Sequence, residues 1–326
     1  MLDGLGREIN YLRISITDRC NLRCRYCMPE KGVTLKRHDE ILSFEEIELL
    51  VSVAAEVGIR KVRLTGGEPL IRREVVELVR RIASHPLIDD LAITTNGILF
   101  SPMARELKEA GLNRVNISLD TMQEERYSYI TRGGDLGKVL QAVEIALRED
   151  MHPVKINMVV IRGFNEDEIL DFCRLAYERP VHVRFIEFMP VGELLFWQKD
   201  RIMKCEEIKT MIENQYDLFP AKITRGNGPA KYFGLAGGQG TVGFISPMSN
   251  HFCHECNRLR LTADGKLRAC LYHGQETNLK EALKKGATRE EIREMIVQTI
   301  LSKPAKHHME KDAWGQKDRK MYQIGG

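Results

Sequence analysis

The sequence lacks any apolar run long enough to cross a membrane, so we expect a soluble protein with no membrane partner. The chain does not begin with a basic segment followed by an apolar one, which favours a cytoplasmic protein over a secreted one. It also lacks a strong excess of one charge, since 49 Lys and Arg against 46 Asp and Glu give a net charge of +3. So small an excess gives no indication of nucleic-acid binding.

The sequence does contain eight cysteines, which without an export signal indicate a reducing compartment and metal ligation rather than disulfides. Six of them form two groups with the spacings C-x3-C-x2-C and C-x2-C-x13-C. The first group is Cys20, Cys24 and Cys27, and the second group is Cys253, Cys256 and Cys270. Cys173 and Cys205 have no such spacing, so we expect both to be small buried apolar residues.

The first cysteine group follows a short strand-like run at residues 11–16. Three thiolates on one loop can converge on one centre, but they are one ligand too few for a closed zinc site or a fully protein-ligated four-iron cluster. The simplest interpretation is a [4Fe–4S] cluster with one iron left open for a small molecule. The alternatives are a zinc loop or three unrelated thiols.

Strand-like and helix-like segments alternate over the first part of the chain. Strands are predicted at residues 11–16, 60–65, 91–95, 114–119, 154–161 and 181–188, with helices at 43–57, 73–84, 102–111, 135–149 and 166–179. Six β-α units predict a parallel sheet covered by helices, and they are fewer than a closed eight-fold barrel needs. We therefore expect an α/β fold, an open partial (β/α)6 TIM-type barrel with ligands at the C-terminal ends of its strands.

Most of the predicted strands end in polar or glycine-rich residues, as a binding site at that edge requires. The second strand ends in Gly66-Gly67-Glu68-Pro69. Two glycines let the backbone approach a ligand closely, and Glu68 can accept hydrogen bonds from an ammonium group. Taken alone, the same run could be an ordinary turn.

The alternation stops near residue 190, where we place a boundary between a barrel domain, 1–190, and a C-terminal region, 191–326. In this region a helix is predicted at 205–213, and Asp264-Gly265 is typical of a β-hairpin turn. The hairpin would bring Cys270 back beside the other two cysteines of the second group. The spacing alone leaves open a structural zinc site completed by His251, His254 or His273. We expect His307 and His308, which lie among lysines, to be solvated.

The first cysteine group, with Tyr26 before its third cysteine and Gly66-Gly67-Glu68-Pro69 downstream, resembles the signature of the radical S-adenosylmethionine (SAM) enzymes. In that family the open iron binds the amino and carboxylate groups of SAM. An electron from the cluster then splits SAM and produces a 5′-deoxyadenosyl radical. The resemblance implies that the Gly-Gly-Glu-Pro run holds the amino group of SAM.

The second cysteine group, in the run C-x2-C-N-R-L-R-L-T-x-D-G-x-L-R-x-C, resembles that of the GTP 3′,8-cyclases, which begin molybdenum cofactor biosynthesis. The likeness extends from Arg13 to the terminal Gly325-Gly326. It implies a second [4Fe–4S] cluster that binds the guanine of GTP, in a C-terminal region that closes the barrel mouth. Both groups should then face one cavity. The implied lyase reaction removes the 3′ hydrogen of GTP and forms (8S)-3′,8-cyclo-7,8-dihydroguanosine 5′-triphosphate.

The resemblance also implies a role for individual residues. The implied SAM contacts are Tyr26, Gly67, Ser118 and Met189. The implied GTP contacts are Arg13, Arg63, Thr94, Lys155, Arg258, Leu259 and Arg260. Each cysteine group would bind one cluster, and the tail with Gly325 and Gly326 would reach into the active site and assist catalysis.

The cations among these residues also stand out by their positions. Arg13, Arg63 and Lys155 interrupt short apolar strands, and a cation directed into a barrel needs an anionic partner. Arg258 and Arg260 are two residues apart, so on a strand they share one face. Arginine forks match phosphate oxygens in pairs, as the triphosphate of GTP requires.

The resemblance further implies a homodimer, an electron donor that it does not identify, and the next enzyme of the molybdopterin pathway as a partner. The nearest alternative is another two-cluster radical SAM enzyme, such as a peptide maturase, although those usually carry more C-terminal cysteines. The second alternative is a zinc-dependent nucleic-acid-binding protein. It would leave the Gly-Gly-Glu-Pro run without a function, and the chain lacks the aromatic-basic interleaving of single-strand binders.

Overall fold

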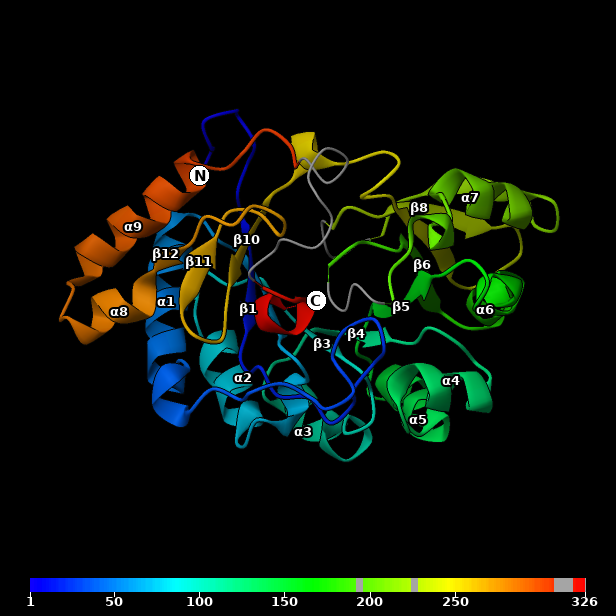
Figure 1. The fold of residues 1–326 in the computed structure, drawn as a ribbon, viewed down its shortest axis with the longest axis horizontal. Coiled ribbons are helices and arrows are strands. Elements are labelled where there is room, and N and C mark those ends of the chain that lie inside the picture. The colour runs from blue at the N-terminus through cyan, green and yellow to red at the C-terminus, as the bar shows by residue number, and fades with distance from the viewer. Residues whose placement is uncertain (192–195, 224–227, 308–318, 326) are drawn as a thin grey trace.

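The computed structural model describes residues 1–191, 196–223, 228–307 and 319–325 (Figure 1). Its centre is an open sheet in the order β12-β11-β10-β1-β2-β3-β4-β5-β6-β9-β8-β7. Six consecutive parallel strands form its middle: β1 (Tyr11–Ser15), β2 (Lys61–Thr65), β3 (Asp90–Thr95), β4 (Arg114–Ser118), β5 (Val154–Val160) and β6 (Val181–Glu187). The predicted open partial barrel is therefore confirmed.

Helices cover the outer face of these strands (Figure 1). They are α1 (Phe44–Val57), α2 (Val75–Ala83), α3 (Ala104–Glu109), α4 (Glu124–Thr131), α5 (Leu136–Arg148) and α6 (Ile169–Glu178). Helix α1 begins at a capping box, in which Ser43 Oγ accepts from Glu46 N at 3.1 Å and Glu46 Oε2 accepts from Ser43 N at 2.7 Å. Helix α4 was not predicted, because its sequence has few apolar residues and buries only Tyr127, Ile130 and Thr131.

The C-terminal region extends the sheet at both of its edges. Its elements are α7 (Cys205–Glu213), β7 (Leu218–Ala221), β8 (Lys231–Leu235), β9 (Thr241–Ile245), β10 (Arg258–Leu261), β11 (Lys266–Arg268), β12 (Thr277–Asn278), α8 (Leu279–Lys284), α9 (Arg289–Leu301) and α10 (Met321–Ile324). Strand β9 pairs in parallel with β6, and β10 pairs in parallel with β1. The predicted helix and hairpin are confirmed as α7 and β10-β11, whereas the boundary near residue 190 stays a prediction.

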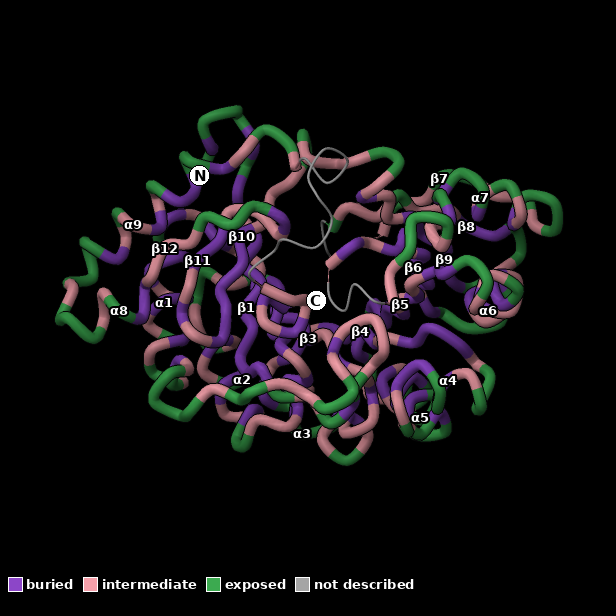
Figure 2. Tube along the Cα trace, viewed as in Figure 1, coloured by how far each residue is buried: buried purple, intermediate pink, exposed green. Residues whose placement is uncertain are grey.

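Short 3-10 helices also occur in the connections: η1 (His38–Glu40), η2 (Pro69–Ile71), η3 (Ser101–Met103), η4 (Glu166–Glu168), η5 (Lys199–Arg201) and η6 (Cys253–Glu255). Figure 2 shows that buried residues concentrate on the central strands and on the sides of the helices that face them. Strand β1 is buried along its whole length, with Leu12 and Ile14 in the apolar core. Among the described residues, no helix has the length and apolar character needed to cross a lipid bilayer.

Candidate active site

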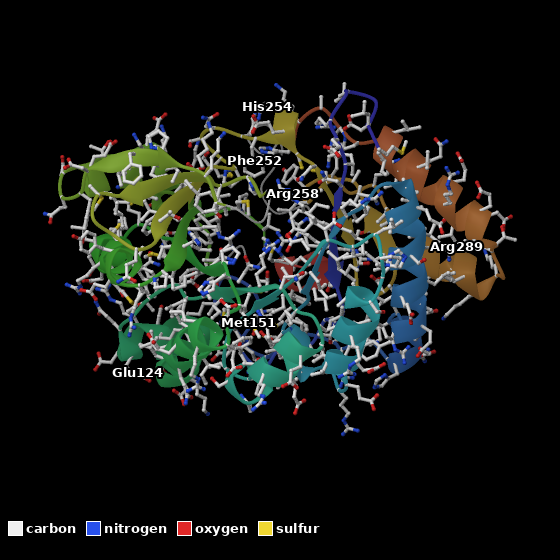
Figure 3. All side chains as sticks on the ribbon, turned by 180° about the vertical axis from the view of Figure 1, so that it is seen from behind. Glu124, Met151, Phe252, His254, Arg258 and Arg289 are labelled. Atoms are coloured by element: carbon white, nitrogen blue, oxygen red, sulfur yellow. The ribbon has the colours of Figure 1, made fainter. Side chains whose placement is uncertain are left out.

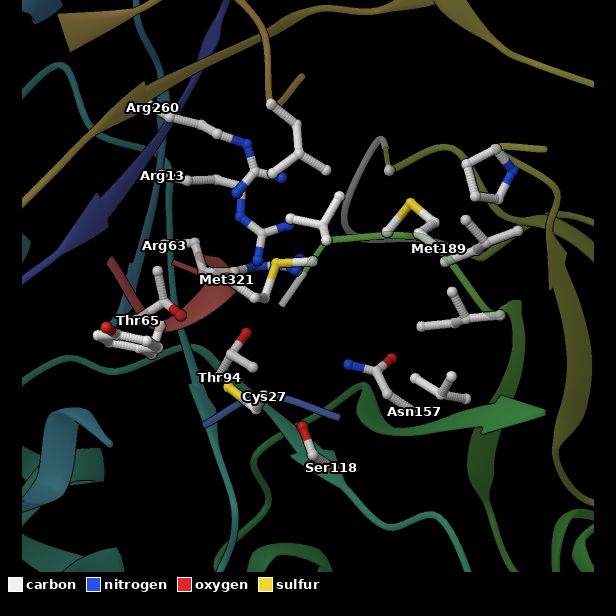
Figure 4. Close-up of a pocket in the computed structure, with 18 of the residues that line it drawn as sticks. Arg13, Cys27, Arg63, Thr65, Thr94, Ser118, Asn157, Met189, Arg260 and Met321 are labelled. Carbon is white, nitrogen blue, oxygen red and sulfur yellow. The ribbon is translucent and has the colours of Figure 1, made fainter. Parts of the chain in front are cut away.

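One cavity is enclosed by the barrel and the C-terminal region (Figure 4). The cysteines of both groups line it: Cys20, Cys24, Cys27, Cys253, Cys256 and Cys270. The prediction that the two groups share one cavity is therefore confirmed. The first group follows the C-terminal end of β1, whereas Cys256 precedes β10, which runs parallel to β1. The two groups consequently lie toward opposite ends of these neighbouring strands.

The loop of the first group is a tight turn that α4 supports. The carbonyl of Cys24 accepts from Cys27 N at 2.9 Å and from Met28 N at 3.0 Å. Just beyond α4, Arg132 Nη1 donates to the carbonyls of Arg23 at 2.7 Å and Met28 at 2.9 Å. The helix that the sequence did not predict is therefore followed directly by the residue that holds the cysteine loop.

The thiols of the first group lie in a poorly solvated environment. Burial raises the pKa of Cys20 to about 11 and that of Cys27 to about 12, and burial together with the charge of Cys27 raises the pKa of Cys24. Thiolates in this loop therefore need a positive partner, which a bound iron cluster would supply, and its binding would release protons. Within the described ranges, no three Cys, His, Asp or Glu side chains converge closely enough to hold a single metal ion.

The two glycines after β2 allow this strand end to pack against the cysteine loop. A Cβ on Gly67 would lie 2.2 Å from the carbonyl oxygen of Arg19, and a Cβ on Gly66 would lie 2.6 Å from that of Thr17. Glu68 is buried, and its carboxylate accepts from Leu70 N at 3.0 Å, Thr95 Oγ1 at 2.8 Å and Asn96 N at 2.7 Å. Burial raises the pKa of Glu68 to about 7. The carboxylate thus ties β2 to β3, a role that the sequence did not indicate.

The four residues that the family resemblance assigns to SAM all line the cavity: Tyr26, Gly67, Ser118 and Met189. Tyr26 donates its hydroxyl to Asp120 Oδ2 at 2.6 Å, and burial raises the pKa of Asp120 to about 6. Their lining positions are compatible with the assigned role, which stays a prediction.

Three arginines form a row across neighbouring strands. Arg13 on β1 pairs in register with Arg260 on β10 and with Arg63 on β2, so the three side chains share one face. Figure 4 shows them side by side, extending into the cavity. Each is at most 9% exposed. Burial lowers the pKa of Arg63 to about 10, and burial with the charge of Arg258 lowers that of Arg260 to about 9. This arginine row therefore favours a polyanionic ligand.

Other cavity residues also present polar atoms that a ligand could satisfy. Among the described residues, Arg63 Nε, Thr94 Oγ1, Asn157 Oδ1 and Arg184 Nε have no hydrogen-bond partner, although all are buried. Arg184 on β6 was not singled out from the sequence. Its signal was available, because it interrupts the apolar run of its strand just as Arg13 and Arg63 do.

Two predicted GTP contacts do not line the cavity. Lys155 is only 2% exposed and lies on β5 two residues before Asn157, which does line the cavity. Burial and the charge of Arg184 lower the pKa of Lys155 to about 5. Leu259 is fully buried in the apolar core, on the strand face opposite Arg258 and Arg260, which both line the cavity. The roles predicted for Lys155 and Leu259 remain untested.

In the second cysteine group, burial raises the pKa of Cys253, whereas Cys256 lies in a more positive environment. Burial alone would raise the pKa of Cys256, but the charges of Arg258 and Lys303 outweigh it and lower the pKa to about 6. Arg258 Nη2 lies 3.6 Å from Cys256 Sγ, and its guanidinium carbon lies 4.9 Å from the ring centre of Phe252. Figure 3 labels Arg258 and Phe252 as neighbours. The expectation of a solvated His307 is wrong, because this residue is half-buried and lines the cavity, with its ring 5.4 Å from that of His251. His308 lies outside the described residues.

The C-terminal tail enters this site. Figure 1 shows α10 in the middle of the open side of the sheet. The carbonyl of Gly325 accepts from Arg260 Nη1, and that of Ile324 accepts from the same nitrogen at 3.3 Å. Gly325 has a φ of +75°, and a Cβ there would lie 2.4 Å from Thr65 Cγ2. The structure therefore places Gly325 against β2 and the arginine row, while Gly326 lies outside the described residues.

Comparison with known proteins decides the family. Residues 14–176 match the model of the Radical SAM superfamily, and residues 181–309 match that of Molybdenum Cofactor Synthesis C. A GTP 3′,8-cyclase of Syntrophomonas wolfei is 63% identical over 327 residues, and one of Moorella thermoacetica is 55% identical over 326 residues. Both alignments cover 100% of this chain and 100% of the relative. This chain belongs to the GTP 3′,8-cyclase family.

Solved structures support the fold of this GTP 3′,8-cyclase family member. SuiB of Streptococcus suis, bound to S-adenosylmethionine, superposes with a TM-score of 0.60 over 97% of this chain and 77% of its own, at 13% identity. Methylornithine synthase (PylB) gives a TM-score of 0.51 over 64% and 63%, at 20% identity. At these identities the likeness concerns the fold alone, and it agrees with the open radical SAM barrel.

Proposed function

We propose that this chain binds two [4Fe–4S] clusters, SAM and GTP in the shared cavity, and cyclises GTP to its 3′,8-cyclo-7,8-dihydro derivative as a lyase. The observation that carries the proposal is the cavity itself. It combines two groups of three thiols near its opposite ends with a row of buried arginines on strands between them.

The donor sets fit the groups that the family requires. Each cysteine group offers three thiols, which can hold a four-iron cluster while leaving one iron for a small molecule. When bound, the first cluster and SAM supply the reducing electron and the radical that removes the 3′ hydrogen from GTP. The four residues assigned to SAM line the cavity together with the first group, and the cysteines of the second group are the assigned ligands on the guanine side.

The chain itself contributes binding, orientation and exclusion of water. The arginine row, with Arg184 and Arg258, is suited to bind the triphosphate by paired hydrogen bonds. Fixing the triphosphate at one end and the base at the other would restrict the ribose between them. Restricting a reactant in this way can remove much of the entropic part of a barrier. The tail adds a backbone contact at Arg260 and narrows the space beside β2.

Anaerobic reconstitution followed by incubation with SAM, dithionite and GTP tests this proposal. We expect about eight irons per chain and formation of the cyclic nucleotide. Cys256→Ala should lower the iron content to about half and abolish cyclisation, while SAM cleavage persists at the first group. Stoichiometric zinc in place of iron would contradict the proposal.

A second expectation concerns the anchor of the tail. Arg319 donates to Asp264 at 2.9 and 3.0 Å and to Glu276 at 2.5 and 3.0 Å, six residues before Gly325. Arg319→Met should release the tail and lower cyclisation about tenfold or more, because small displacements of positioning groups have large effects on rate. Arg293→Met is the matched control, because Arg293 pairs with Glu290 within the same helix, α9. Equal turnover of both variants would show that this anchor is dispensable.

The remaining expectations follow from the family alone. We propose a homodimer in the cytoplasm, supplied with electrons by a separate donor and followed by the next enzyme of the molybdopterin pathway. Sedimentation of the reconstituted protein tests the first of these directly, because a monomer would contradict it.

A further inference from the structure

Two buried cations lie outside the cavity lining and contact the backbone of the second cysteine group. Arg7 is 7% exposed, and its Nη1 donates to the carbonyl of Cys253 at 2.8 Å. Its Nη2 donates to the carbonyls of Lys303 at 3.2 Å and Pro304 at 2.9 Å, and its Nε contacts Asp3 Oδ2 at 2.6 Å. Arg7 thus connects the N-terminal turn, the first cysteine of the second group and the segment after α9.

Lys303 completes the arrangement. It is 5% exposed, and its Nζ donates to the carbonyl of Arg258 at 2.8 Å and to the carbonyl of Ala269. Arg258 lies two residues after Cys256, and Ala269 immediately precedes Cys270. Together, Arg7 and Lys303 therefore hold a backbone carbonyl at, or within two residues of, each of the three cysteines. We call this pair the basic brace.

The buried charge of Lys303 is not neutralised by a carboxylate among the described residues. Among the described residues, Lys303 forms no ion pair with a carboxylate, whereas the similarly buried Lys280 pairs with Glu46 at 3.0 Å. A buried ammonium is unfavourable unless a negative charge compensates it. Burial lowers the pKa of Lys303, the thiols of Cys256 and Cys270 oppose this shift, and the charges of Arg258 and Arg7 add to it. In the ligand-free protein the buried ammonium is therefore under-compensated.

We propose that the basic brace positions the second cysteine group and that Lys303 is the counter-ion of its thiolates. The inference rests on the proposed function, because it assumes that this group binds a cluster. A cluster held by three thiolates becomes more negative when it is reduced, so a fixed buried cation favours the reduced form. Lys303 therefore raises the reduction potential of the second cluster, while the first cluster, which lies on another loop, is unaffected.

Lys303→Met tests the counter-ion, because methionine keeps an unbranched apolar stem and removes the charge. The reduction potential of the second cluster in reconstituted protein can be measured by EPR-monitored redox titration. We expect its equilibrium constant for one-electron reduction to fall at least tenfold, which corresponds to a reduction potential about 59 mV lower. The signal of the first cluster serves as an internal control. Lys280→Met is the matched control, since it removes a lysine of similar burial that is paired with Glu46 rather than with thiols.

The outcomes separate the inference from the proposed function. A lowered potential of the second cluster alone, or loss of about half the iron in Lys303→Met but not in Lys280→Met, supports the brace. An unchanged potential with full iron content, or equal damage in both variants, overturns it. If the unmodified protein never holds a second cluster, the proposed function fails instead.

Arg7→Met tests the positioning role by a measurement that does not depend on activity. We expect faster amide hydrogen exchange at residues 253–257 of the reconstituted protein, because the carbonyl of Cys253 loses its buried donor. Exchange in the loop of Cys20, Cys24 and Cys27 should not change. Unchanged exchange at 253–257 would show that Arg7 does not position this segment.

Discussion

Deletion of Gly325 and Gly326 is expected to abolish detectable cyclisation of GTP, while both clusters and the cleavage of SAM are retained. Gly325 contacts Arg260 through its carbonyl and lies against Thr65, two residues that line the cavity, and Met321 and Tyr322 of the tail line it as well. We expect a loss of at least about a hundredfold in turnover, the scale on which displaced positioning groups act. Product formation and 5′-deoxyadenosine formation, measured in the same reaction, separate the two steps.

Gly325→Ala gives a more local version of this test. The added Cβ would meet Thr65 Cγ2 at 2.4 Å, and the φ of +75° is unfavourable for a residue with a side chain. We therefore expect most of the effect of the deletion from a single methyl group. Gly286→Ala also places a Cβ at positive φ, but in open space on the surface, and controls for backbone strain alone. Full cyclisation by the truncated chain would refute a role for the tail.

Arg63→Met is expected to weaken GTP binding while it stabilises the ligand-free protein. Arg63 is buried beside other arginines, and its Nε has no partner among the described residues. Loss of a charge-assisted contact with phosphate, about 1.5–3 kcal/mol, corresponds to roughly ten- to hundredfold weaker binding. Replacing buried ion pairs with apolar side chains is often neutral or stabilising by about 1–4 kcal/mol, and for a buried charge beside like charges we expect a gain of that order. Calorimetric titration and thermal unfolding measure the two effects separately.

Arg114→Met is the contrasting control for this pair of effects. Arg114 is equally buried but pairs with Asp90 through two contacts at 2.7 and 2.8 Å. Its removal would leave the Asp90 carboxylate buried and unpaired, so we expect destabilisation of about 3–5 kcal/mol. If Arg63→Met destabilises the ligand-free protein as strongly as Arg114→Met, the arginine row is structural and not an anion-binding device.

The barrel could be predicted from the sequence because its information is local. Each β-α unit has its own apolar periodicity, and the capping box of Ser43 and Glu46 marks the N-terminus of α1 in the sequence. The hairpin of β10 and β11 was predictable for the same reason, since Asp264-Gly265 lies between its strands. The cysteine spacings similarly identified both groups before their surroundings were known.

The rest of the site depends on contacts between distant segments, which leave no local pattern. The pairing of β10 with β1 joins residues about 250 positions apart and creates the in-register arginine row. Arg184 interrupts the apolar run of β6 as Arg13 and Arg63 interrupt theirs, but the family resemblance assigns it no role. The roles of Arg7 and Lys303 likewise depend on long-range contacts, because Arg7 donates to the carbonyl of Cys253 and Lys303 donates to the carbonyl of Ala269. Helix α4 escaped prediction because only Tyr127, Ile130 and Thr131 of its eight residues are buried, which leaves no clear apolar periodicity.

The most direct test of the account uses GTP labelled with deuterium at the 3′ carbon, incubated with the reconstituted protein, SAM and dithionite. Two cysteine groups that share one cavity should bring the ribose and the adenosyl group of SAM together. The account predicts deuterium in the 5′-deoxyadenosine that is released, together with the cyclic nucleotide. Release of unlabelled 5′-deoxyadenosine, with the GTP left unchanged, would contradict it.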